Sequence, residues 1–357
     1  QKMGFLDRKI KLIELGKALK NMLLSNSSSS GIKAISLDQL TKQVAFRNPW
    51  FTPDAVKNAV AVWTELLTEQ PINDWLAPYS IPNVPENSRT VGVVNAGNIP
   101  FVGLHDLLAV YISGHAYQGK NASEDPFLLP WIIDVWSSIC PEVRSSFSFT
   151  DRLSDMEAVI ATGSDNSSRY FEYYFSKYPH IIRKNRNGIA ILDGNETPDD
   201  LNGLGKDIFT YYGLGCRNVA KLYLPRGYDL PVLFEALYPF NHVMAHHKYM
   251  NNFDHHHAVY LLKGIPFLQN NFVILKEDTA IASPLAVVFY EFYDSTDDLI
   301  QALNTRKEVI QCVAAPQYLH QKLKEEGLPA VIFGQTQSPK LSDYADGVDT
   351  IGFLLKI

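Results

Sequence analysis

The feature that most constrains the fold is a regular alternation of short apolar runs with helical segments, which begins at Arg89. In the first half of the chain, strands are predicted at residues 90–95, 115–120, 157–161 and 189–192, with helices at 101–113, 126–138 and 166–177. In the second half, strands are predicted at residues 220–224 and 286–293, with helices at 199–212, 230–238, 241–251 and 296–303. Successive parallel strands need a crossover connection, so this order predicts an α/β fold with largely parallel sheets.

The two ends of the chain are expected to differ from this pattern. Leucine spacing predicts a helix near residues 12–23, and two further helices are predicted at 37–44 and 54–67. Between the first two, the serine-rich tract Ser25–Ser30 is predicted to be a loop. At the other end, residues 350–356 are predicted to form a strand with no helix after it. Such a strand is typical of a sheet edge or of a strand donated to a neighbouring subunit.

Composition excludes several classes of protein. Hydrophobic residues make up 46% and charged residues 20%, which is an ordinary globular balance, and 38 acidic residues outnumber 32 basic ones. A nucleic-acid binder is therefore not expected, because the phosphate backbone is met by a surplus of Lys and Arg. No apolar run approaches the ~18 residues of a membrane span, and the N-terminus lacks a signal-peptide pattern. Three scattered cysteines fit neither a disulfide framework nor a thiolate zinc site, so a reducing, cytoplasmic location is expected.

One of the cysteines differs from the other two. Cys216 lies in the segment YYGLGCRN, residues 211–218, between a predicted helix and a predicted strand. The two glycines allow unusual backbone angles and the close approach of a ligand, and the adjacent Arg217 favours the reactive thiolate. We interpret Cys216 as a candidate nucleophile. The alternative is a small buried hydrophobe, which is how we interpret Cys140 and Cys312.

Two turns that follow predicted strands are further candidates. Asn98 lies just beyond the strand at 90–95, where α/β sheets place their sites, and its amide could donate to a developing oxyanion. Thr162, Gly163 and Ser164 join a strand to a helix N-terminus, whose N–H groups suit a phosphate. The ordinary interpretations are a turn asparagine and a helix cap. The chain has no GxGxxG fingerprint.

The histidines form a fourth group. Six of the ten fall within sixteen positions, namely His242, His246, His247, His255, His256 and His257. The first two are one turn apart on a predicted helix, a spacing that metal ligands also use, and Asp254 is the one nearby carboxylate. We expect no physiological metal, and we interpret the group as a polar helix face and a loop beside a substrate entrance. A metal-dependent hydrolase is kept as an alternative.

Taken together, the order of these elements resembles the aldehyde dehydrogenase superfamily and, within it, the acyl-CoA reductase (LuxC-like) branch. The resemblance runs from Val91 to the C-terminus. VVNAGNIP, which contains Asn98, is similar to the family's strand ending in Asn-aromatic-Pro. The strand ending at Lys120, followed by Ser123, resembles the family's Lys-Pro-Ser-Glu, with one residue inserted and the proline lost.

The remaining matches lie further along the chain. ATGS at residues 161–164 is similar to the Phe-Thr-Gly-Ser turn beside the cofactor pyrophosphate. GLGC, which ends at Cys216, is similar to the nucleophile segment at close to the family interval. The resemblance implies two α/β domains with the active site between them. Residues 1–190 would be a helical lead-in plus the nicotinamide-cofactor-binding domain, 191–335 the catalytic domain, and 336–357 a C-terminal strand that serves oligomerisation.

The resemblance also implies roles for particular residues and a reaction. The expected catalytic residues are Cys216 and Asn98, and the expected cofactor-binding residues are Lys120, Ser123, Thr162, Gly163 and Ser164. The implied cofactor is NADPH or NADH, with a weak preference for NADPH. The implied reaction is reduction of a fatty acyl-CoA, or another acyl thioester, to the aldehyde through a thioacyl-cysteine. A homo-oligomer is expected, and an acyl-donating partner protein is left open.

Two departures from the family pattern matter. Hydrolytic aldehyde dehydrogenases carry a glutamate base in Glu-Leu-Gly-Gly, whereas residues 182–187 here contain no carboxylate. A water-activating base is needed to release an acid, so its absence favours transfer to and from a thiol, although Glu172 or Asp193 could supply a base from another element. The family's Glu-Phe-Gly-Pro is replaced by ASPL at residues 282–285. Oxidative CoA-acylating chemistry and a non-catalytic binding protein of this fold are the remaining alternatives.

Overall fold

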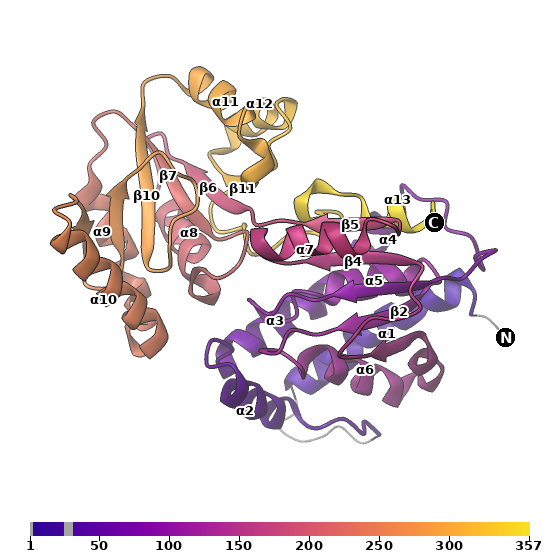
Figure 1. Ribbon diagram of the computed structural model, residues 1–357. Helices are drawn as coiled ribbons and strands as arrows, with labels where there is room; N and C mark the ends of the chain where they lie inside the picture. The colour runs from indigo at the N-terminus through magenta and orange to yellow at the C-terminus, as the bar shows by residue number, and fades with distance from the viewer. Residues whose placement is uncertain (1–2, 25–30) are drawn as a thin grey trace. The chain divides into compact units, whose positions relative to one another are not determined.

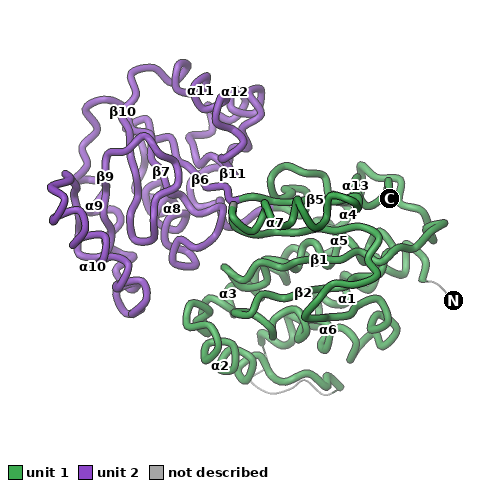
Figure 2. The backbone as a smooth tube through the Cα atoms, viewed as in Figure 1, with its two compact units in different colours: residues 1–184, 340–357 green, residues 185–339 purple. Residues whose placement is uncertain are grey.

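The computed structural model describes residues 3–24 and 31–357, so the loop predicted at Ser25–Ser30 lies outside the described residues. The chain divides into two units (Figure 2). Unit 1 comprises residues 1–184 and 340–357, and unit 2 comprises residues 185–339. The chain therefore enters unit 2 once and returns to unit 1 for its final segment.

The described residues of unit 1 form a five-stranded parallel sheet in the order β3-β2-β1-β4-β5 (Figure 1). The strands are β1 Thr90–Val94, β2 Ala116–Lys120, β3 Phe147–Phe149, β4 Ala158–Thr162 and β5 His180–Arg183. The helices between them are α5 Leu104–Ile112, α6 Leu128–Ile139 and α7 Asp165–Phe175. The central strands β1 and β4 are apolar and mostly buried, as a parallel sheet covered on both faces requires.

Four helices precede this sheet. They are α1 Phe5–Leu24, α2 Leu37–Arg47, α3 Pro53–Leu66 and α4 Glu69–Leu76, of which the sequence pattern does not predict α4. The Oγ1 of Thr52 accepts a hydrogen bond from the N–H of Ala55 at 3.3 Å, and Pro53 occupies the first position of α3. Pro there loses no hydrogen bond, because the first N–H groups of a helix have no partner within it. α1 packs against α3, α5 and α6 and extends the core of unit 1.

The described residues of unit 2 form a seven-stranded sheet in the order β12-β11-β6-β7-β10-β9-β8, in which β8 alone runs antiparallel. The strands are β6 Asn187–Ile191, β7 Val219–Pro225, β8 Leu268–Gln269, β9 Ile274–Glu277, β10 Val287–Tyr293, β11 Ile310–Ala314 and β12 Ala330–Val331. The α-helices are α8 Pro198–Phe209, α9 Leu230–Leu237, α10 His247–Leu262, α11 Thr296–Asn304 and α12 His320–Glu325. The predicted α/β class with largely parallel sheets is confirmed.

The strand predicted at residues 350–356 is wrong. The segment forms the short helix α13 Thr350–Leu354, which begins behind Asp349, whose Oδ1 accepts a hydrogen bond from the N–H of Gly352 at 2.8 Å. The buried residues Ile351 and Leu354 are three positions apart, which is helical spacing. A short apolar run does not distinguish the two periods, and the aspartate cap decides between them.

α13 is fastened to unit 1 by long-range hydrogen bonds. Arg183 donates from Nη2 to the Oγ1 of Thr350 at 3.1 Å. The Nε2 of His115 lies 2.8 Å from the carbonyl oxygen of Leu354, while its Nδ1 accepts from the N–H of Arg89, so this histidine is neutral and Nε2 is the donor. The final segment of the chain is thereby part of the packing of unit 1.

The helix predicted at residues 241–251 is also wrong in its continuity. The chain forms the 3₁₀ helix η3 Tyr238–Ala245 and then α10, with His246 in an extended conformation between them. The Nδ1 of His246 accepts a hydrogen bond from the N–H of Tyr249, which makes this side chain the cap of α10. Among the described residues, no helix combines the length and apolar character that crossing a bilayer requires.

Candidate functional site

The carboxyl edge of the sheet in unit 1 is a topological switch point. From β1 the chain moves to β2 and β3 on one side, and then crosses to β4 and β5 on the other. Open α/β sheets bind ligands in the crevice formed at such a point. Val94 pairs with both Lys120 and Ala161, so the ends of β1, β2 and β4 are level at this edge.

All the residues of unit 1 that the sequence nominates follow strands at this edge. They are Asn98 after β1, Lys120 and Ser123 at the end of β2 and beyond it, and Thr162, Gly163 and Ser164 at the end of β4. The structure brings their loops to one edge of one sheet. Cys216 belongs to unit 2 and is described separately below.

The turn after β4 is tightly packed against its own helix. Ser164 caps α7 through its Oγ, which lies 3.3 Å from the N–H of Ser167. A Cβ added at Gly163 would lie 2.8 Å from the ring of Phe171 and 2.9 Å from the Cβ of Ser167. Only glycine fits there without displacing the helix. The hydroxyl of Ser164 is used in capping, so the main-chain N–H groups at the start of α7 are what this turn offers to a phosphate.

The loops after β1 and β2 are tied to each other. Asn95 donates from Nδ2 to the hydroxyl of Tyr117 at 2.8 Å and to the Oδ1 of Asn121 at 3.0 Å. Phe101 is buried and has a φ of 59°, in the left-handed region that few non-glycine residues adopt. A strained residue held by surrounding packing is characteristic of functional loops, and this one closes the loop that carries Asn98.

A cation beside this edge is not identified from the sequence. Arg47, the last residue of α2, donates from Nε to the carbonyl oxygen of Ser123 at 2.8 Å. Its guanidinium therefore lies beside the loop that follows Lys120. Nearby, burial raises the pKa of Asp125 to about 6, and its Oδ1 accepts from the N–H of Leu128 at the start of α6. No local sequence signal connects α2 to this loop, because the residues are 76 positions apart.

Cys216 lies at the amino edge of the sheet in unit 2, where β7 begins. It precedes the first residue of β7, and it occupies a turn in which the N–H of Asn218 donates to the carbonyl oxygen of Gly215 at 3.1 Å. The thiol is half-buried. Just before this turn, Tyr211 and Tyr212 have φ values of 51° and 57°. Two consecutive tyrosines in the left-handed region are a strained arrangement, and they end α8 earlier than the sequence predicts.

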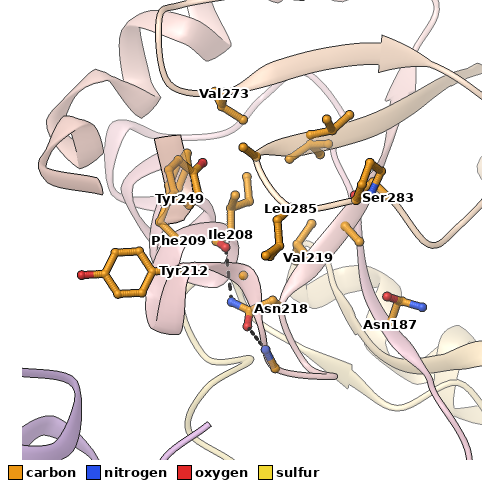
Figure 3. A pocket seen from close by; sticks show the side chains of 17 residues that line it. Asn187, Ile208, Phe209, Tyr212, Asn218, Val219, Tyr249, Val273, Ser283 and Leu285 are labelled. Carbon is orange, nitrogen blue, oxygen red and sulfur yellow. Dashed lines mark hydrogen bonds between the residues drawn. The ribbon is translucent and has the colours of Figure 1, made fainter. Parts of the chain in front are cut away.

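A small pocket opens beside this turn (Figure 3). It has a volume of about 50 Å³ and is lined by Gly215, Phe209, Tyr249, Leu285 and Val288, among others. Tyr249 uses its hydroxyl to donate to the carbonyl oxygen of Phe272 at 2.9 Å. The lining combines polar groups, among them Asn218 and Ser283, with apolar side chains, and the pocket has room for a small group beside Gly215, which precedes Cys216.

The segment without a carboxylate, residues 182–187, is engaged in ion pairs. Arg183 forms a buried pair with Asp106, and Lys184 lies 3.0 Å from the carboxylate of Glu172. Asp193 follows the carboxyl end of β6, whereas Cys216 precedes the amino end of the parallel neighbour β7. Asp193 and Cys216 thus lie at opposite edges of one sheet, so Asp193 does not reach Cys216 within unit 2.

The histidine group is spread over two elements. His242 lies on η3, His246 is the extended residue before α10, and His255, His256 and His257 lie on α10 rather than in a loop. Neighbouring rings pack on each other, with 5.0 Å between the centroids of His255 and His256. Within residues 3–24 and 31–357, no three His, Cys, Asp or Glu side chains are grouped so that they could hold a metal ion.

No protein-family model matches the chain, and no curated protein matches it. Solved structures do. Aldehyde dehydrogenase 21 from Physcomitrella patens, solved with its reaction product succinate, is 13% identical, with a TM-score of 0.68 over 99% of this chain and 84% of that one. An aldehyde dehydrogenase from Bacillus cereus bound to NAD⁺ is 13% identical, with a TM-score of 0.64 over 92% of this chain and 76% of that one.

A third similar structure is a mutant of aldehyde dehydrogenase C from Pseudomonas syringae with NAD⁺ and octanal. It is 11% identical, with a TM-score of 0.63 over 90% of this chain and 76% of that one. At these identities the likeness concerns the fold. The chain has the aldehyde dehydrogenase fold, as the resemblance in sequence implies.

Proposed function

We propose that the protein is a nicotinamide-dependent oxidoreductase that reduces an acyl-CoA thioester to the aldehyde through a thioacyl intermediate on Cys216. The observation that carries the proposal is the pairing of two features in one chain. One is a switch-point edge at which the glycine turn after β4 leads into the N-terminus of α7, an arrangement that suits the pyrophosphate of a nicotinamide dinucleotide. The other is a half-buried cysteine on a glycine-rich turn where a second sheet begins.

The chain's own residues have the following roles in this reaction. The thiolate of Cys216 attacks the thioester carbonyl, and the carbon–sulfur bond to CoA breaks, so that CoA leaves as the thiol. Asn98 and the main-chain N–H of Cys216 stabilise the oxyanion of each tetrahedral intermediate. When bound, a nicotinamide cofactor would supply the hydride that reduces the thioacyl carbon. Collapse of the resulting oxyanion releases the aldehyde and regenerates the thiolate, with one proton taken up overall.

The cofactor is proposed to lie along the edge formed by the ends of β1, β2 and β4. Lys120 and Ser123 would meet the adenosine ribose or its 2′-phosphate, and Thr162, Gly163 and Ser164 would meet the pyrophosphate. The cations at Lys120 and Arg47 favour NADPH, because a 2′-phosphate adds negative charge at that position. The octanal in the Pseudomonas syringae structure is consistent with an aliphatic product here.

The same residues would also run the reaction in reverse, as a CoA-acylating aldehyde dehydrogenase. The ion-paired segment 182–187 supports acyl exchange with a thiol over hydrolysis in either direction. A homo-oligomer, a cytoplasmic location and an acyl-donating partner are parts of the same proposal. Light scattering of the purified protein tests the first of them.

The test is oxidation of NADPH and of NADH against a panel of acyl-CoAs, with the aldehyde trapped as a hydrazone. Without reductant, acyl-CoA should add one acyl group to the protein, and mass spectrometry should place it on Cys216. Cys216→Ala should lose both the adduct and the reduction while it keeps cofactor binding. An adduct on Cys140 or Cys312, or none with any acyl-CoA, would show that the proposal is wrong.

A further inference from the structure

The turn that carries Cys216 is closed from both ends by a single residue. The N–H of Asn218 donates to the carbonyl oxygen of Gly215 at 3.1 Å. In the opposite direction, the N–H of Gly215 donates to the Oδ1 of Asn218 at 2.8 Å. Cys216 and Arg217 are the two corner residues of this turn. Both peptide groups that flank Gly215 are therefore fixed, and the second of them carries the N–H of Cys216.

The same side chain anchors the turn to the preceding helix. The Nδ2 of Asn218 donates to the carbonyl oxygens of Asp207 at 3.0 Å, Ile208 at 3.3 Å and Thr210 at 2.8 Å, and Figure 3 shows the bond to Ile208 beside the pocket. These carbonyls belong to the end of α8, where no helical N–H remains to pair with them. Asn218 is 3% exposed, so water does not replace these bonds.

Two further hydrogen bonds hold the turn, one to Gly188 and one to Thr336. The N–H of Gly188 donates to the carbonyl oxygen of Asn218 at 3.1 Å, and a Cβ added at Gly188 would lie 2.5 Å from the carbonyl oxygen of Arg217. Arg217 donates from Nε to the carbonyl oxygen of Thr336 at 2.5 Å. Strand β6, which contains Gly188, thus supports the turn through main-chain contact.

The stretch that Asn218 spans is strained. Tyr211 and Tyr212 adopt left-handed backbone angles, which side chains disfavour, and they lie between Thr210 and Gly215. Thr210 and Gly215 are both hydrogen-bonded to the side chain of Asn218. Without those bonds the strained residues would relax toward commoner angles, and the peptide of Cys216 would move with them.

We propose that Asn218 is a positioning residue for Cys216. Its side chain holds the peptide of Cys216 in one orientation, so that the thiol and the main-chain N–H face the same acyl carbonyl. The inference rests on the proposed function, in which Cys216 is the nucleophile. In this proposal Asn218 acts through the turn, because the four hydrogen bonds of its side chain are all made to main-chain groups of residues 207–215.

Amide hydrogen exchange of the wild-type protein tests the first half of this inference. In peptides that cover residues 209–219, the amides of Gly215 and Asn218 should exchange at least 100-fold more slowly than an unprotected amide. Exchange at the unprotected rate would overturn the inference, whatever any variant does. This measurement needs no substrate, so it decides the point even if the wild type forms no acyl adduct and the proposed function fails.

Substitutions test the second half. Asn218→Ala removes every bond of the side chain, and Asn218→Asp keeps an acceptor for Gly215 but turns an oxygen toward three carbonyls. Both variants should acylate about 100-fold more slowly, with KM for acyl-CoA and Kd for the cofactor within twofold of the wild type. The matched control is Asn304→Ala in the same unit, where Nδ2 donates to Glu326 at 2.7 Å, and it should acylate at the wild-type rate.

Three results would contradict a positioning role. One is acylation by Asn218→Ala within threefold of the wild type. Another is a rise in KM or cofactor Kd that matches the loss in rate, which would indicate general damage. The third is equal slowing in Asn304→Ala. A variant that does not fold leaves the exchange measurement on the wild type as the deciding result.

Discussion

Replacing Asp106 with asparagine should destabilise unit 1 strongly, because it leaves the guanidinium of Arg183 buried without its counter-charge. The pair is bidentate, with 2.5 Å between Nη1 and Oδ2 and 2.8 Å between Nη2 and Oδ1. The two side chains are only 5% and 8% exposed. Breaking such a pair by removing one partner costs about 3–5 kcal/mol. In a domain of this size each kcal/mol lowers Tm by about 2–4 °C, so the expected drop is about 6–20 °C.

Differential scanning calorimetry of the full chain measures the effect, with Asp294→Asn as the matched control. Asp294 forms an equally bidentate pair with Arg226, at 2.6 and 3.0 Å, but the two side chains are 72% and 68% exposed. Water screens that pair, so its loss should leave Tm almost unchanged. Since Nη1 of Arg183 also lies 3.4 Å from the Oγ1 of Thr162, Asp106→Asn should weaken cofactor binding as well. A Tm for Asp106→Asn equal to that of the control would refute the reasoning.

Four further outcomes are expected. Burial lowers the pKa of His115 in the folded protein, so below about pH 6.5 the unfolded state binds more protons than the folded state does. The free energy of unfolding should therefore fall between about pH 6.5 and pH 5. Urea unfolding measures this fall, which should be smaller in His115→Gln. Lys120→Ala should raise the Kd of NADPH more than that of NADH, and an equal rise would remove the 2′-phosphate contact. The acyl adduct on Cys216 should yield to CoA but resist water, and free acid formed as fast as aldehyde would reveal a working base. Gly188→Ala should slow formation of that adduct at least tenfold without loss of circular dichroism, because its Cβ would meet main-chain oxygen at 2.5 Å.

The sequence predicts the central strands well because strands that are buried on both faces consist almost entirely of apolar residues. β1 and β4 are short apolar runs between turn residues, a pattern that is typical of buried strands in a parallel sheet. The nominated residues of unit 1 follow from the same logic, since polar residues after buried strands must share the carboxyl edge. The strand order that brings Lys120 and Thr162 to either side of β1 becomes visible only in the structure.

What the sequence misses depends on contacts between distant positions. Asp106 and Arg183 are 77 residues apart, and nothing near either one marks it as half of a buried pair. Tyr211 and Tyr212 carry no turn signal, because their backbone angles are imposed by the bonds that surround them. Asn218 is an ordinary polar residue in the sequence, and its importance lies in the four hydrogen bonds of its side chain and the two of its main chain.

The order in which unit 1 is completed has a consequence for its synthesis. The bond from Arg183 to Thr350 spans 167 residues, and the contact from His115 to Leu354 spans 239. At about 5–20 residues per second, the ribosome needs roughly 8–33 s to add the residues between Arg183 and Thr350. During that interval the five strands of unit 1 have all been made, but the helix that covers Arg183 has not. A nascent chain that stalls within unit 2 therefore presents an unfinished unit 1 to chaperones and proteases, so slow synthesis of unit 2 should be detected first as loss of unit 1.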